Sequence, residues 1–254
     1  MADGSQPLRG GRSAFRPKLL PSLLTLIMVA ILIGLGVWQL QRLEWKTGLI
    51  ADLEQRTAAA PITLNEALAD PSASQYRPVR VTGRWLHERE MRLLARTYRG
   101  EPGLHIVTPL ALSDGQRLLV DRGWVPLSAE DPVRRTAGQP QGIVTVIGLA
   151  RLGGWDGRDF LRPENDPAEN AWLWMDLPTM AEAAGLSQPV TALYLAALAD
   201  QHSGRYPIGG QTRVELENNH LQYAITWFVL AAAAVAVFFL SQRRRQEDAS
   251  SARE

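Results

Sequence analysis

Two long apolar runs near the ends of the chain constrain its fold more than any other feature. The first extends from Leu19 to Leu40, and the second, YAITWFVLAAAAVAVFFL, extends from Tyr223 to Leu240. A helix rises about 1.5 Å per residue and a hydrocarbon core is about 30 Å thick, so each run approaches the roughly 20 residues that a spanning helix needs. We therefore expect transmembrane helices over residues 19–41 and 220–240, in contact with membrane lipid.

Positive charge lies outside both runs. Four cations precede the first run, Arg9, Arg12, Arg16 and Lys18, and three arginines follow the second at 243–245. Lysine and arginine beside a span are retained in the cytoplasm. We therefore expect cytoplasmic tails at 1–18 and 241–254 and an extracytoplasmic domain at 42–219.

A cleaved signal peptide is the alternative interpretation of the first run. Its apolar part would be only about 7–15 residues long and would end at small residues, whereas this run ends in WQLQR. The basic N-terminus is short and contains an acid, which favours a bacterial inner membrane with a periplasmic domain over an organelle.

Composition and missing motifs exclude several classes of protein. The chain has no cysteine and a formal net charge of +1, so disulfides and thiolate sites are absent and a nucleic-acid partner is not expected. The patterns GxGxxG, GxxxxGK[ST], GxSxG and HExxH do not occur. We therefore expect no enzymatic activity, although the sequence leaves open a catalytic triad whose members are scattered along the chain.

The segment between the spans changes from helical to strand periodicity. The first helix is expected to continue to Ala58 before Pro61, and short helices are expected at Asn65–Ala69, with Thr63 or Asn65 as the N-cap, and at Pro178–Ala184. Turn signals separate strand patterns at Pro78–Trp85, Met91–Tyr98, Leu104–Leu112, Arg117–Val125, Ile143–Leu149, Trp172–Met175 and Val190–Leu198. A short helix is the alternative for Val190–Leu198. The predicted fold is a membrane α+β protein, in which two transmembrane helices flank an extracytoplasmic antiparallel β domain with one or two packed helices. The sheet of this domain could be partly closed into a barrel.

Acidic residues crowd the loop at 151–171, where a cation could be proposed to bind. They are Asp156, Asp159, Glu164, Asp166 and Glu169. The spacing is not that of a calcium-binding EF-hand loop. A solvated loop is therefore the favoured interpretation.

His220 stands out among the four histidines because an apolar span begins three residues later. Its imidazole is expected at the outer membrane boundary, where it could bind haem iron as an axial ligand. A plain interfacial or hydrogen-bonded histidine is the alternative. Tyr223 and Trp227 follow at helical spacing and could form the walls of a cofactor pocket, although an aromatic anchoring belt is a common role for such residues.

The first helix carries a matching set of residues. Trp38 and Arg42 recur at a helical step with Gly34 and Trp45. Arg42 could pair with a haem propionate, a lipid headgroup or a carboxylate of the domain, or could be an ordinary interfacial arginine. The small residues Gly34 and Gly36 would allow another helix to approach closely.

Taken together, these segments resemble the surfeit-locus-one family of cytochrome c oxidase assembly factors, bacterial type. LGVWQLQRLEWK at 35–46 is similar to the family's LGxWQxxRxxWK signature, and NHLQYAITWF at 219–228 is similar to its closing NHLxYAxTWF. Between them PVRVTGRW, GLHIVTPL, VDRGWVP and PEN follow in the family's order. The resemblance covers about residues 19–240.

The resemblance implies a non-catalytic factor that assists haem a insertion into, or stabilisation of, subunit one of a haem-copper oxidase. The family's histidine that is implicated in haem binding corresponds to His220, and haem a synthase is a further expected partner. No such role carries over to His105, which is expected to be structural. The alternatives are a scaffold for oxidase assembly that does not bind haem and a membrane sensor with an extracytoplasmic ligand domain.

Overall fold

The computed structural model describes residues 19–155, 157–199, 206–212 and 218–251, which fall into two compact units. The first unit comprises the described residues within 1–49 and 217–254, and the second those within 50–216. The expected tail at 1–18, the acid Asp156 and the end of the C-terminal tail lie outside the described residues.

Two long helices account for both apolar runs. They are α1 (Leu19–Ala58) and α4 (His220–Ser251), and both are long and apolar enough to cross a membrane. Most of their large apolar side chains are exposed in the protein alone. Apolar surface on this scale is expected of a lipid-facing helix rather than of a water-facing one, so the two helices fit a membrane protein. The predicted extension of the first helix to Ala58 is confirmed.

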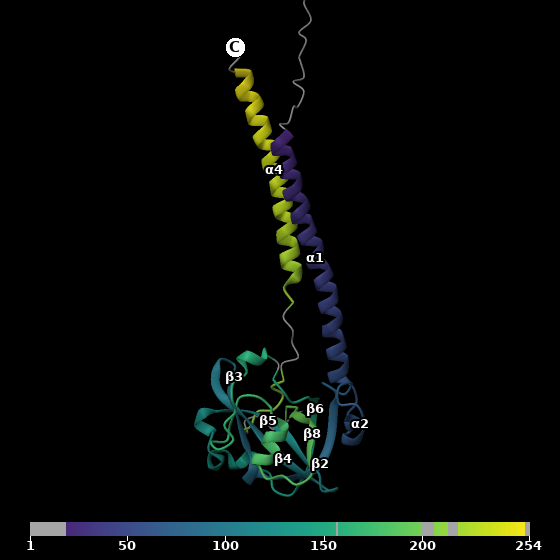
Figure 1. Cartoon of the computed structure of the whole chain (residues 1–254), viewed down its shortest axis with the longest axis vertical. Helices are drawn as coiled ribbons and strands as arrows, with labels where there is room; N and C mark the ends of the chain where they lie inside the picture. The colour runs from purple at the N-terminus through teal and green to yellow at the C-terminus, as the bar shows by residue number, and fades with distance from the viewer. Residues whose placement is uncertain (1–18, 156, 200–205, 213–217, 252–254) are drawn as a thin grey trace, which may run out of the picture. The chain divides into compact units, whose positions relative to one another are not determined.

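The second unit is built on one eight-stranded sheet, whose longer strands are labelled in Figure 1. Its strands are β1 (Ile62–Thr63), β2 (Pro78–Trp85), β3 (Met91–Tyr98), β4 (Glu101–Leu112), β5 (Arg117–Pro126), β6 (Ile143–Arg151), β7 (Ala171–Trp172) and β8 (Pro189–Ala197). The strand order is β1-β2-β6-β8-β5-β4-β3-β7, and β2 also pairs with β4. That extra pairing closes β2, β6, β8, β5 and β4 into a five-stranded barrel, so the predicted partial closure is confirmed.

Alternation of apolar and polar residues places the barrel's core. Along β2, Val79, Val81 and Trp85 are buried, whereas Arg80 and Thr82 are exposed. The buried residues join side chains of β4, β5 and β8 in one apolar cluster. A second cluster lies under α3 (Leu177–Ala183), where Met180 and Trp172 are fully buried. Because strand side chains alternate between faces, the period of two in the sequence suffices to orient these strands.

The short helices begin at side-chain caps. Thr63 caps α2 (Leu64–Ala69), and the Glu66 carboxylate accepts in return from the Thr63 backbone N–H, which completes a capping box. This backbone hydrogen bond, followed by the one from the Thr63 hydroxyl, lowers the pKa of Glu66. Asp176 caps α3, which ends before Gly185 at a φ of +58°. Both predicted helices are confirmed.

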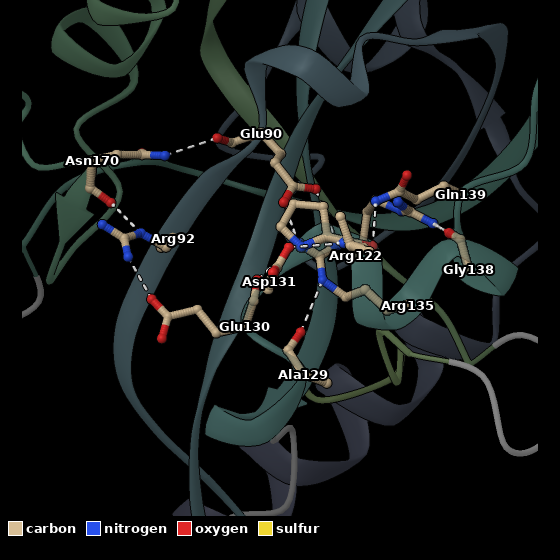
Figure 2. Close-up of polar contacts among 12 residues, drawn as sticks. Glu90, Arg92, Arg122, Ala129, Glu130, Asp131, Arg135, Gly138, Gln139 and Asn170 are labelled. Atoms are coloured by element: carbon tan, nitrogen blue, oxygen red, sulfur yellow. Dashed lines mark hydrogen bonds and ion pairs between the residues drawn. The ribbon is translucent and has the colours of Figure 1, made fainter.

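A network of ion pairs ties the start of β3 to η3 (Pro132–Gly138), a segment that the sequence pattern did not predict. Figure 2 shows the Arg135 guanidinium facing the Glu90 carboxylate. The Arg135 side chain is fully buried and that of Glu90 is 10% exposed. Arg135 also donates to the Ala129 carbonyl oxygen at 3.1 Å, and Arg92 pairs with Glu130. The network therefore fixes the 127–138 connection against the barrel.

Two further details refine the predicted sheet. The segment at 190–198 is a strand, so its helical alternative is wrong: its alanines pair within the sheet as part of β8. The predicted strand at Trp172–Met175 is two residues long and covers Ala171–Trp172. Most pairings are antiparallel, but β8 runs parallel to β5, as β1 does to β2 and β7 to β3.

Candidate functional site

The two apolar helices pack against each other within the first unit (Figure 1). Gly36 of α1 lies against the ring of Phe228 of α4, and a Cβ atom added to Gly36 would lie 2.6 Å from the Phe228 ring. Asn218, just before α4, donates to the Thr47 hydroxyl at 3.4 Å. Higher numbers on α1 thus meet lower numbers near α4, so the helices are antiparallel. Gly34 has nothing within 4 Å, so the close approach predicted for both glycines holds for Gly36 alone.

His220 contacts the first helix through Gln39. The distance from His220 Nδ1 to Gln39 Oε1 is 2.7 Å, and Gln39 is only 9% exposed. When Nδ1 carries the proton and donates to the amide oxygen, Nε2 is left with a free electron pair. A histidine that binds a metal has this arrangement in most proteins, because the second hydrogen bond sets the tautomer and the ring orientation.

Sequence reasoning overlooked Gln39, although a signal was present. It is the single amide within the run from Leu19 to Leu40. A polar side chain in a spanning helix generally faces a partner helix, because lipid cannot satisfy its hydrogen bonds. That rule would have directed Gln39 toward α4.

The other predicted site residues are arranged less tightly. Trp38 and Tyr223 are about half exposed, at 50% and 56%. Trp227 is half-buried, and its indole Nε1 is buried with no hydrogen-bond partner among the described atoms. Arg42 stacks on Trp45, with Cζ 4.6 Å from the ring centroid. The structure thus joins His220 to Gln39 and Arg42 to Trp45, and no hydrogen bond, ion pair or ring contact between the described side chains joins His220 to Trp38 or Arg42.

The second unit holds a separate polar pair, one member of which, His105, was predicted to be structural. His105 of β4 and Asp121 of β5 lie on the two paired strands of a hairpin, and His105 Nδ1 is 2.9 Å from Asp121 Oδ2. Their side chains are 11% and 12% exposed. Both line a cavity of about 1000 Å³ within the second unit.

Metal binding by the acidic loop finds no support in the described part of the chain. No group of three or more histidine, aspartate or glutamate residues is gathered there in an arrangement that could hold a metal ion. Asp166 accepts a hydrogen bond from the Glu169 backbone N–H at 3.2 Å, as expected of a capped turn. The interpretation of the loop as a solvated segment remains the favoured one.

Comparison with known proteins gives consistent matches over most of the chain. The model of the SURF1 family matches residues 26–232. Surfeit locus protein 1 of Mus musculus is 39% identical over 222 residues, which cover 82% of this chain and 71% of that protein. The Homo sapiens protein of the same name is 38% identical over 215 residues, or 78% and 70% of the two chains. A SURF1-like protein of Drosophila melanogaster is 38% identical over 225 residues, or 82% and 72%.

Proposed function

The chain belongs to the SURF1 family, and we propose that it is an assembly factor for a haem-copper cytochrome c oxidase that assists haem a insertion into subunit one. The proposed location is a bacterial inner membrane, crossed by α1 and α4, with both termini cytoplasmic and the barrel periplasmic. The proposed role is transient binding and transfer of haem a, or stabilisation of an oxidase intermediate, rather than catalysis. Subunit one and haem a synthase are the proposed partners.

The hydrogen bond between Gln39 and His220 carries this proposal. It joins the two family signatures, which lie at opposite ends of the sequence, through one buried amide and one imidazole. Gln39 would hold the His220 ring so that Nε2 presents its electron pair to iron. Bound haem a would supply the redox-active iron that the oxidase requires.

The surrounding residues fit an amphipathic cofactor. Tyr223 and Trp227 follow His220 in sequence and Trp38 adjoins its partner Gln39, so all three could provide aromatic surface, and Arg42 provides a charge for a propionate. Arg42 is exposed and is held by a ring rather than by a carboxylate. It can therefore accept an anionic group without first breaking an ion pair.

The test is the visible absorption spectrum of the detergent-purified protein co-expressed with a haem a synthesis pathway. Wild type is expected to show a haem a band that His220→Ala loses. His87→Ala is the matched control, because His87 bonds the Pro140 carbonyl oxygen within the barrel unit, and its band should persist. Gln39→Leu should weaken or shift the band, and Gln39→Glu, which keeps an acceptor, should preserve it.

Absence of the band from a folded wild-type protein would overturn haem carriage. Co-purification of oxidase subunit one distinguishes the remaining roles. Subunit one retained by both wild type and His220→Ala, with no haem in either, would support the scaffold function. Neither haem nor subunit one on wild type would overturn the assembly function as a whole.

A further inference from the structure

The barrel unit contains a cavity that the proposed haem role does not use. Its volume is about 1000 Å³, at the upper end of the range for small-molecule sites. The cavity lies where the end of β3 meets the segment after β6 and the residues that follow β7. All of its lining residues belong to the second unit, so it is independent of His220.

The one described acid that lines the cavity is already committed. Asp121 Oδ2 pairs with His105 Nδ1, and Asp121 Oδ1 accepts from the Gly123 backbone N–H at 2.9 Å. Both carboxylate oxygens therefore have partners within the barrel. His105 keeps its second ring nitrogen, Nε2, as a further polar atom that the Asp121 pair does not use.

Three arginines line the same cavity, namely Arg96, Arg99 and Arg151. The described residues place no carboxylate in an ion pair with any of the three. Arg96 donates to the carbonyl oxygens of Leu94 and Leu173 at 3.2 and 3.4 Å. A guanidinium that bonds only neutral carbonyls retains its charge for an anion, so the described lining residues carry more positive than negative charge.

Arg151 supplies the most specific observation. Its Nε is buried and has no hydrogen-bond partner among the described atoms. Its guanidinium lies over the Tyr76 ring, with Cζ 4.8 Å from the centroid, which restrains its orientation. A buried unpaired donor on a cation costs free energy, and no described carboxylate offsets the charge of this guanidinium at the cavity wall.

The aromatic lining residues are also held in place. Trp155 Nε1 donates to the Arg158 carbonyl oxygen, and Trp174 Nε1 donates to the Pro163 carbonyl oxygen, both at 3.1 Å. With their polar edges committed, these two indoles line the cavity with apolar ring surface, and Arg162 Cζ lies 5.6 Å from the Trp174 ring centroid. Fixed aromatic surface favours a flat conjugated ligand, because stacking then costs little side-chain entropy.

We propose that this cavity binds a planar anionic small molecule, an aromatic or conjugated carboxylate, whose acidic group pairs with Arg96 and Arg151 while its ring lies against Trp155 and Trp174. The site does not depend on haem binding by His220. It gives the barrel unit a ligand of its own.

Isothermal titration calorimetry of the full chain in an uncharged maltoside detergent tests this proposal. The probe is naphthalenedicarboxylate, a flat water-soluble dianion. Its diamide keeps the shape without the charge, and adipate keeps the charge without the ring. Wild type is expected to bind the dianion at least about tenfold more tightly than the diamide, since each well-formed charge-assisted contact contributes on the order of one factor of ten. It should also bind the dianion more tightly than adipate, which has no ring to lie against the indoles.

Variants locate the site. Arg96→Gln and Arg151→Gln should each weaken binding of the dianion about tenfold or more. Arg80→Gln removes the same charge from an exposed position on β2 outside the cavity and should bind as wild type does. Thermal unfolding of each variant checks that the barrel is intact. No heat with wild type, equal binding of adipate, or equal weakening in all three variants would overturn the proposal.

Discussion

A Cβ atom on Gly36 would lie 2.6 Å from the Phe228 ring, so the two helices approach at a position where only hydrogen fits. The contact lies one helical turn from Gln39, and the glycine therefore lets α4 come close enough for His220 to reach the amide. Replacement of this glycine should separate the helices and break the hydrogen bond together.

The prediction for Gly36→Val is a loss of helix pairing. Overpacking of this kind costs about 1–3 kcal/mol. The chain has no cysteine, so the pair Thr47→Cys and Asn218→Cys can report helix approach through the rate of oxidative cross-linking. Cross-linking should slow several-fold in Gly36→Val and should recover when Phe228→Ala is added. Gly34→Val, at an open position, should cross-link at the same rate as the double-cysteine protein without a glycine substitution. A similar loss of cross-linking there would contradict the packing argument.

The buried pair of Glu90 and Arg135 should dominate the stability of the 127–138 connection. Glu90→Ala leaves a fully buried guanidinium without its carboxylate, which costs about 3–5 kcal/mol. Asp52→Ala removes one partner of an exposed i,i+4 pair and should cost about 0.2–1 kcal/mol. Urea unfolding of the full chain, followed by tryptophan fluorescence, measures both. Equal losses would show that burial does not control the value of this ion pair.

The capping box of α2 should contribute stability that is lost in acid. The Thr63 backbone N–H, and then its hydroxyl, lower the pKa of Glu66 below its ordinary value of 4.5. A carboxyl group whose pKa is lowered by folding stabilises the folded state above the unfolded pKa, and this contribution disappears as pH falls through the folded pKa. Carboxyl NMR of a glutamate-labelled sample should show a partial rise in the Glu66 pKa in Thr63→Val, because the backbone hydrogen bond remains. An unchanged pKa would exclude the hydroxyl as a cause.

Gly123 should be intolerant of a side chain for a reason beyond its φ of +110°. An added Cβ would lie 1.9 Å from the Ile208 carbonyl oxygen, which accepts from the Trp124 N–H. Gly100 also has a positive φ, of +83°, but nothing lies within 4 Å of its Cβ position. Gly123→Ala should therefore lose more stability than Gly100→Ala and should expose the Trp124 amide to hydrogen exchange. Equal exchange in the two variants would refute this packing effect.

Local patterns were sufficient to predict most of the secondary structure. The strands at Pro78–Trp85 and Met91–Tyr98 have the predicted bounds, because alternating burial and flanking turn residues define both of their ends. The N-cap of α2 is Thr63, one of the two residues predicted for it, because its capping box joins residues only three positions apart in the sequence.

Contacts between distant segments could not be predicted in the same way. Pairing of β2 with β4, which closes the barrel, depends on strand curvature, and the pairing of Glu90 with Arg135 joins residues 45 positions apart. The cavity is also a product of tertiary structure, because it forms where residues as distant as Arg96 and Gln211 meet. Recognition of His220 came from its place beside an apolar run, whereas its partner Gln39 lies 181 residues away.

Strand order in the barrel also bears on how the domain is made. β8 is the last of the described strands, yet it lies between β6 and β5, both of which are synthesised earlier. Until Ala197 has emerged, the two earlier strands present open edges that can pair with other chains. During synthesis the edges of β5 and β6 therefore stay unpaired until shortly before the second apolar helix appears. A protein proposed to assist the assembly of another complex would itself depend on protection at this stage.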